Sequence, residues 1–182
     1  MKACPAREEA LALLAVTPVP HNAVAQVSCR KKWYSRTSNH KFNVVAVDCG
    51  IKLNIIRSLN QRGCNVTVVP YNTSAEEIRR MDPDGIFLSN GPGDPQEVKN
   101  LKTGRLEITS QNHSYAVDEK TLAGTGLTVT HVNLLDGTVE GVESVEDRIF
   151  SVQYHPESAP GPQDSTYLFD QFLDMMKEAP HA

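Results

Sequence analysis

The stretch Val44-Val45-Ala46-Val47-Asp48-Cys49-Gly50 decides how this 182-residue chain is expected to fold. Its four consecutive apolar residues are typical of a strand that is buried on both faces of a sheet. Its last three residues are typical of a tight turn. Residues 51–62 follow with Leu53, Ile56 and Leu59 at helical spacing. The stretch therefore predicts the first strand–turn–helix unit of an α/β fold.

The same rhythm continues along the chain. A second strand is predicted over residues 66–69 and a third over 86–88, with a helix over 74–81 between them. Ser74 and Glu77 match a capping box, in which each side chain accepts a backbone N–H of the other residue. Alternating strands and helices indicate a doubly wound parallel sheet with right-handed crossovers.

The C-terminal half is predicted to be mostly β-structure, with Asp136-Gly137 as a hairpin turn. The four predicted strands are residues 105–109, 127–132, 138–142 and 149–154. A final helix is predicted from Asp164, acting as its N-cap, to Met176. Its apolar face is expected to consist of Leu168, Phe172, Leu173 and Met176.

Composition narrows the function classes. The net charge is −4 and no strongly basic run occurs, so nucleic-acid binding is not expected. No apolar stretch approaches the length of a transmembrane helix, so no membrane partner is expected. The four cysteines are scattered without a Cys-x-x-Cys pair, which argues against a zinc site or a disulfide framework. We therefore expect a cytoplasmic protein without a metal site.

Residues 1–41 are heterogeneous and are predicted to be an arm or linker preceding a domain at 42–182. A helix is expected over residues 7–16 and a short extended piece over 25–29. The apolar run at 10–16 resembles a secretory signal, but Glu8 and Glu9 stand directly before it, where a signal carries positive charge.

The segment Gln153-Tyr154-His155-Pro156-Glu157-Ser158 holds the first candidate site. His155 lies at the predicted end of a strand, and Glu157 is two residues on. An extended backbone would direct both side chains to one face. An imidazole beside a carboxylate forms the base and orienting part of a nucleophilic triad. The alternative is a solvated histidine beside a solvated glutamate.

Two further segments are candidates. Asn90-Gly91-Pro92-Gly93-Asp94-Pro95 lies past the carboxyl end of a strand, where open α/β sheets bind ligands. Its glycines allow a substrate to approach backbone N–H groups, although a surface turn has the same composition. Cys49 lies on a strand-to-helix turn, which is the geometry of a nucleophile elbow.

Four segments, taken together and in order, resemble the glutaminase domain of the small subunit of carbamoyl-phosphate synthase, a class I (triad-type) glutamine amidotransferase. They are Val47–Arg57, Leu88–Pro95, Ser110–His113 and Gln153–Glu157. The resemblance implies a mixed, mostly parallel sheet with helices on both faces. It also implies a mechanism in which a cysteine attacks the amide of L-glutamine, ammonia leaves and water hydrolyses the thioester.

The resemblance implies roles for particular residues. His155 would be the base and Glu157 its orienting carboxylate, while the backbone of Gly91 and Gly93 would hold glutamine and help to form the oxyanion hole. The glutamine α-substituents would be held by Asn112, Ser114 and Tyr115, of which Ser114 replaces the family's glycine. Ammonia would pass to the large subunit of the synthase. That subunit uses ATP and bicarbonate to make carbamoyl phosphate for pyrimidine and arginine biosynthesis, so no cofactor is expected in this chain.

The chain departs from the family in one respect. The family carries its nucleophile on an elbow of the type Gly-x-Cys-x-Gly-x-Gln, between the glycine loop and the Ser-Gln-Asn-His segment. Here Gln96 runs directly into Glu97, and no cysteine occurs after Cys64. The central elbow strand and helix are thus expected to be absent, as is most of the small subunit's N-terminal domain. The match places Cys49 in the first turn, as a small buried residue.

We therefore predict a truncated amidotransferase domain without glutaminase activity. The alternatives are a non-catalytic module that binds glutamine or docks on the synthase, and a non-functional truncated product. A metal hydrolase using His113, His131 and His155 is disfavoured because their spacing fits no ligand pattern. Because a central strand buries apolar area on both faces, its loss predicts marginal stability unless the strands on either side close up.

Overall fold

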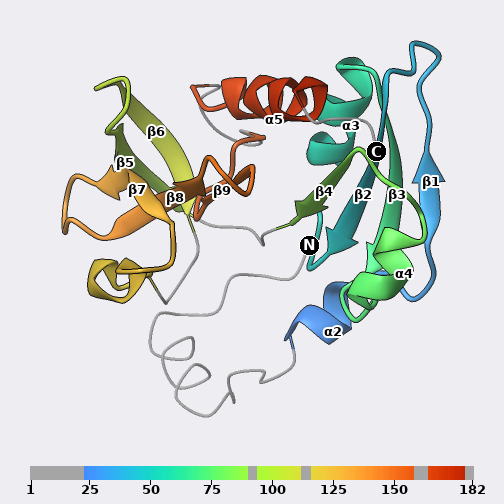
Figure 1. Ribbon diagram of the computed structural model, residues 1–182, viewed down its shortest axis with the longest axis horizontal. Helices are drawn as coiled ribbons and strands as arrows, with labels where there is room; N and C mark the ends of the chain where they lie inside the picture. The colour runs from blue at the N-terminus through green and yellow to red at the C-terminus, as the bar shows by residue number, and fades with distance from the viewer. Residues whose placement is uncertain (1–22, 90–93, 112–115, 158–163, 179–182) are drawn as a thin grey trace, which may run out of the picture.

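The computed structural model describes residues 23–89, 94–111, 116–157 and 164–178, and divides its strands between two sheets (Figure 1). In the first sheet the order is β1-β3-β2-β4. Strands β2, β3 and β4 are parallel, as predicted, and β1 pairs antiparallel with β3. The bounds are β1 Trp33–Ser35, β2 Phe42–Asp48, β3 Cys64–Pro70 and β4 Gly85–Leu88.

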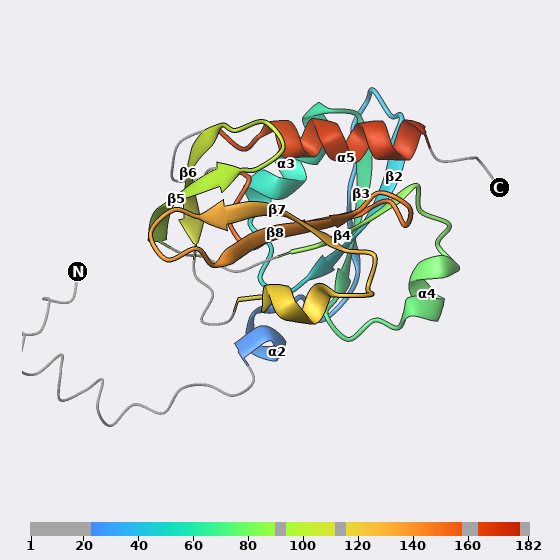
Figure 2. The same cartoon turned by 60° about the vertical axis from the view of Figure 1, so that its left-hand side comes forward.

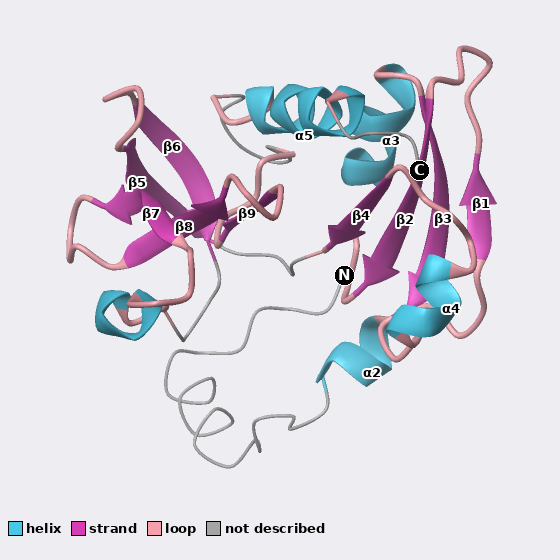
Figure 3. Cartoon of the chain, viewed as in Figure 1, coloured by secondary structure: helices cyan, strands magenta, loops and turns pink. Residues whose placement is uncertain are grey.

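The second sheet is antiparallel throughout, with the order β6-β5-β7-β8-β9. Its strands are β5 Asp94–Asn100, β6 Leu106–Gln111, β7 Thr128–Asn133, β8 Val139–Ser144 and β9 Ile149–Val152, and a 3-10 turn at Glu119–Leu122 precedes β7. Among the described residues, no strand joins β4 to β9, so each is an edge of its own sheet (Figure 3). This division into two sheets was not predicted from the sequence.

Helices cover both faces of the first sheet, as predicted (Figure 2). The residues of β2 alternate between two cores. Val44 and Ala46 pack with helices α3 (Leu53–Gln61) and α5 (Tyr167–Lys177). Val45 and Val47 pack with α4 (Ala75–Arg79). Strand β2 is therefore buried on both faces, which explains the apolar run of residues 44–47.

Most local predictions are confirmed. Ser74 and Glu77 form the capping box of α4. Gly137, in the turn between β7 and β8, has φ of +74°, a left-handed conformation that suits glycine. The predicted role of Asp164 is wrong, because Thr166 occupies the N-cap position of α5. The Asp164 carboxylate instead accepts a hydrogen bond from the backbone N–H of Ile108 at 3.3 Å.

The N-terminal segment differs from the prediction. The piece expected to be extended forms the short helix α2 (Ala23–Val27). The outer edge of β3 is already occupied by β1, so α2 residues have no strand there to pair with. Alanine favours the helical alternative. The helix predicted over residues 7–16 lies outside the described residues.

Strand β5 was not predicted at all. Its side chains beyond Gln96 alternate between exposed and buried, but one of the two buried residues is polar: Val98 points inward and so does Asn100. Period-two alternation is recognised from apolar residues, so a buried asparagine hides the pattern. The buried Asn100 Oδ1 accepts hydrogen bonds from the backbone N–H groups of Lys102 and Thr103. Its Nδ2 donates to the Tyr167 hydroxyl.

Helix α5 spans both sheets (Figure 1). Leu168 packs with Val98 of β5 and with Tyr154, which follows β9. Phe169 and Leu173 pack in the core of the first sheet. In the part of the chain that the structure describes, no helix combines the length and the apolar character needed to cross a membrane.

Candidate functional site

His155 and Glu157 form a buried hydrogen-bonded pair. Strand β9 ends at Val152, two residues earlier than expected, and Glu157 lies in a turn rather than in extended backbone. The turn still brings the two side chains together, with His155 Nδ1 2.9 Å from Glu157 Oε1. Their side chains are 1% and 0% exposed, so the solvated alternative is wrong. The roles of His155 as a base and Glu157 as its orienting carboxylate stay predictions.

The pair defines the protonation of the imidazole. A carboxylate can only accept a hydrogen bond, so His155 Nδ1 carries the proton. In the neutral ring Nε2 is then left with a free lone pair. Nε2 is buried and, among the described residues, has no hydrogen-bond partner. The orientation of the imidazole by a carboxylate is the one that a general base in a triad needs.

Lys52, in the turn between β2 and α3, also contacts the His155–Glu157 pair. Its Nζ lies 3.3 Å from Glu157 Oε1, and it is the residue just before α3. Burial would raise the pKa of Glu157, but the hydrogen bond from His155, the hydrogen bond from its own backbone N–H and the nearby charge of Lys52 outweigh it and lower the pKa. Glu157 therefore stays ionised at neutral pH. Lys52 belongs to a segment of the family resemblance, but nothing in its local sequence assigned it this role.

Tyr154, directly before His155, is anchored in a buried polar cluster. Its hydroxyl donates to Glu107 Oε2 at 3.3 Å, and the same carboxylate accepts from Ser165 at 2.8 Å and from Tyr167 at 2.9 Å. Glu107 is 1% exposed. Burial and the charge of Glu107 raise the pKa of Tyr167 to about 12 and that of Tyr154 further still. Both hydroxyls thus remain donors and hold the backbone next to His155.

His131, one of the three histidines weighed as metal ligands, belongs to this cluster instead. Its Nδ1 lies 2.9 Å from Thr130 Oγ1 and its Nε2 lies 3.3 Å from the Tyr167 hydroxyl. Burial lowers the pKa of His131, so the ring is neutral. In the described parts of the chain, no group of three or more metal-binding side chains occurs.

The described cysteines are poor nucleophiles. Burial raises the pKa of Cys49, and the negative charge of Asp48 raises it further. Burial and Asp48 likewise raise the pKa of Cys29, and burial raises the pKa of Cys64 to about 11. A catalytic thiol needs the opposite shift, because the thiolate is the reactive form. Asp48 itself stays ionised: burial would raise its pKa, but three backbone N–H groups lower it.

The remaining predicted site residues lie outside the described residues: Gly91, Gly93, Asn112, Ser114 and Tyr115. The residues that flank their segments are described. Asp94 opens β5, Gln111 closes β6, and these two residues are paired in the second sheet.

The family model and the similar known proteins indicate the same family. The family described as "Glutamine amidotransferase class-I" matches residues 45–103 and 99–175. The "Carbamoyl phosphate synthase small chain" of Staphylococcus saprophyticus is 44% identical over 216 residues, covering 92% of this chain and 58% of that protein. The protein of the same name from Listeria innocua is 41% identical over 218 residues, covering 93% of this chain and 60% of that protein.

Two features of these matches concern length. The chain spans about three fifths of the length of these relatives. The aligned stretch of 216 residues is longer than the 182-residue chain, so the relatives carry residues within it that have no counterpart here.

A solved structure has a similar fold. It is described as a "putative gmp synthase subunit a protein" from Thermoplasma acidophilum, and it is 15% identical. The superposition has a TM-score of 0.62 and covers 76% of this chain and 95% of that one. At this identity the likeness concerns the fold alone.

Proposed function

Because the chain belongs to the family of class-I glutamine amidotransferases, we propose that it is a glutaminase domain of the carbamoyl phosphate synthase small-chain type that has lost its activity. It retains the base and its orienting carboxylate and lacks the nucleophile. The observation that carries the proposal is the buried His155–Glu157 pair, with 2.9 Å between Nδ1 and Oε1, in a chain that has no cysteine after Cys64.

The sequence supports an internal deletion as the cause. No cysteine follows Cys64, and the family match consists of two blocks that meet at residues 99–103. The relatives' additional residues within the aligned stretch fit a deletion near Gln96 and Glu97. Cys49 is an unsuitable substitute, because burial and Asp48 keep its thiol protonated.

A glutaminase assay tests the loss of activity. We expect the purified chain to release glutamate from L-glutamine no faster than a heat-denatured sample. Removing a triad nucleophile lowers kcat by about a millionfold in one well-studied serine protease. Cys49→Ser should leave this background unchanged. Glutamate release that Cys49→Ser abolishes would overturn the proposal, and the intact Staphylococcus saprophyticus small chain serves as the matched reference.

A chimera tests whether the base is intact. The residues that align between Gln96 and Glu97 are taken from the Staphylococcus saprophyticus small chain and inserted at that junction. We expect the chimera to release glutamate and His155→Ala in the chimera to abolish the release. A folded but inactive chimera would show that more than the nucleophile has been lost.

The partner of the chain follows from the same proposal. We propose that a synthase large chain is its docking partner and that L-glutamine binding is weak, because only part of the pocket remains. Co-purification of tagged chain with a co-expressed large chain, together with calorimetry against L-glutamine, tests both points. If the chain neither co-purifies with the large chain nor binds L-glutamine, the result favours a non-functional truncated product.

A further inference from the structure

Glu107, on β6, is a buried carboxylate to which the family resemblance assigns no role. It is 1% exposed, and three hydroxyl groups donate to it: those of Tyr154, Ser165 and Tyr167, at 3.3, 2.8 and 2.9 Å. In the described part of the chain, no lysine or arginine forms an ion pair with it. A buried carboxylate held by hydroxyls alone is a poor device for stability, because burial of a charge is costly.

The direction of each hydrogen bond around Tyr167 is defined. A carboxylate only accepts, so the Tyr167 hydroxyl donates to Glu107. That oxygen then has only lone pairs left for its other two neighbours, Asn100 Nδ2 at 2.8 Å and His131 Nε2 at 3.3 Å. The neutral His131 ring therefore carries its proton on Nε2, and its Nδ1 accepts from Thr130 Oγ1. A network satisfied in this way holds its members in one arrangement.

This network joins two segments that carry proposed site residues. Tyr154 directly precedes His155, the proposed base. Strand β6, which carries Glu107, ends at Gln111, directly before residues 112–115, which the resemblance assigns to glutamine. One buried carboxylate thus lies on the strand that leads into the substrate segment and binds the neighbour of the base.

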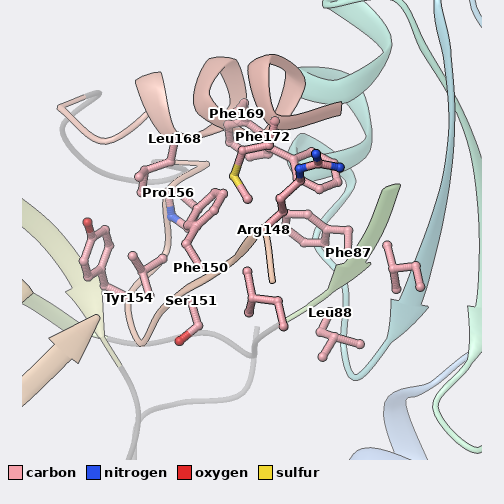
Figure 4. A pocket seen from close by; sticks show the side chains of 14 residues that line it. Phe87, Leu88, Arg148, Phe150, Ser151, Tyr154, Pro156, Leu168, Phe169 and Phe172 are labelled. Atoms are coloured by element: carbon pink, nitrogen blue, oxygen red, sulfur yellow. The ribbon is translucent and has the colours of Figure 1, made fainter. Parts of the chain in front are cut away.

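Tyr154 depends on this hydrogen bond for part of its restraint. Its ring packs against Leu168 and borders an apolar cavity of about 390 Å³. Figure 4 shows Tyr154 at the opposite end of this cavity from Phe87 and Leu88. A side chain that borders a cavity lacks packing contacts on that side. The bond from its hydroxyl to Glu107 is therefore expected to fix the ring, and with it the backbone next to His155.

We propose that Glu107 is a positioning residue, which holds His155 in place relative to the glutamine segment through Tyr154 and does not itself touch the substrate. Polar groups buried at a cost in stability can specify one arrangement of a core. The inference rests on the proposed role of His155 as base. It concerns geometry that this chain retains without a nucleophile.

Exchange of the His155 Nδ1 proton tests the proposal in the chain as it exists. That proton lies in the 2.9 Å bond to Glu157 and is observed by NMR of isotope-labelled histidine side chains, with His155→Gln identifying its signal. We expect Tyr154→Phe and Glu107→Gln each to raise its exchange rate about tenfold, because a buried hydrogen bond that restrains local opening is lost.

Tyr167→Phe is the matched control. It removes a hydroxyl from the same carboxylate and leaves Asn100 Nδ2 and His131 Nε2 without their shared acceptor, so it should lower the unfolding midpoint at least as much as Tyr154→Phe. The bond between Tyr154 and Glu107 remains, so the exchange rate should stay within about twofold of the unmodified chain. Circular dichroism checks folding, and Tyr154→Phe carries the test alone if Glu107→Gln does not fold.

Two results would overturn the proposal. One is an unchanged exchange rate in folded Tyr154→Phe. The other is an equal rise in Tyr154→Phe and Tyr167→Phe, because it would show that the Glu107 network only stabilises the fold. No turnover is measured in this experiment, so its outcome is distinct from that of the glutaminase assay, which alone decides the proposed loss of activity.

Discussion

His155 is a β-bridge residue and Glu157 lies in the turn that follows, so their contact does not depend on a continuous strand. The hydrogen bond of 2.9 Å and the ion pair with Lys52 keep a buried carboxylate charged. The sequence predicted the pairing because His-x-Glu is a local pattern. It could not predict Lys52 or Glu107, since both reach the site from distant parts of the chain.

The ionised state of Glu157 has a consequence for acid stability. Its pKa is lowered from the ordinary value of 4.5 in the folded chain. Its contribution to the free energy of unfolding is therefore complete above that value and is lost as pH falls through the lowered pKa. We predict that Glu157→Gln flattens the pH dependence of stability below 4.5, measured by urea unfolding at a series of pH values.

The matched control for this experiment is Glu146→Gln, in the exposed turn before β9. It should leave the pH dependence as in the unmodified chain. Asp48 also has a lowered pKa and supplies part of the remaining acid sensitivity in every variant. An unchanged slope in Glu157→Gln would contradict the ionised buried carboxylate.

Helix α5 is the element that connects the two sheets. Its buried face combines Leu168, which contacts the second sheet region, with Phe169, Leu173 and Met176, which contact the first. Helical spacing predicted Leu168, Leu173 and Met176 correctly, and the predicted Phe172 is only partly buried. It omitted Phe169, which is buried. Phe169 stacks on Phe87 with ring centroids 6.2 Å apart. The Arg62 guanidinium lies over the Phe169 ring, 5.5 Å from its centroid.

Truncating this side chain should be costly. Phe169 is 2% exposed, so we predict that Phe169→Ala lowers the free energy of unfolding by about 3–5 kcal/mol, which is typical of a large buried aromatic side chain. Urea unfolding followed by circular dichroism measures the loss. Asp174→Ala on the exposed face of the same helix is the control and should change stability by less than about 0.5 kcal/mol. A loss below about 1 kcal/mol in Phe169→Ala would show that α5 is not firmly packed.

Within the described residues, the two sheets share no strand. In the described structure, α5 and the Lys52–Glu157 ion pair connect them, and the edges of β4 and β9 do not close up. Removing a central strand forfeits burial at about 25 cal/mol per Å² of apolar surface. Net stabilities of domains are only about 5–15 kcal/mol, so such a loss is large.

We therefore predict a low thermal stability for the isolated chain. Its unfolding midpoint by calorimetry should lie below the range of about 45–65 °C that is common for mesophilic domains. The reason is the apolar surface left exposed at the sheet edges, where Leu88 is 72% exposed and Ile149 is 53% exposed. A sharp transition within or above that range would contradict the prediction.

The sequence by itself determined the parallel β2–β3–β4 unit, the turns, the capping box and the His155–Glu157 pair. These features depend on residues close together along the chain, through hydrophobic period, backbone conformation and local hydrogen bonds. Only the tertiary structure decided that the strands divide into two sheets, that a buried asparagine helps to form β5, and that Lys52 meets Glu157. Those outcomes depend on which distant segments pack against each other, and within the described residues β4 and β9 each pair with a strand on one side only.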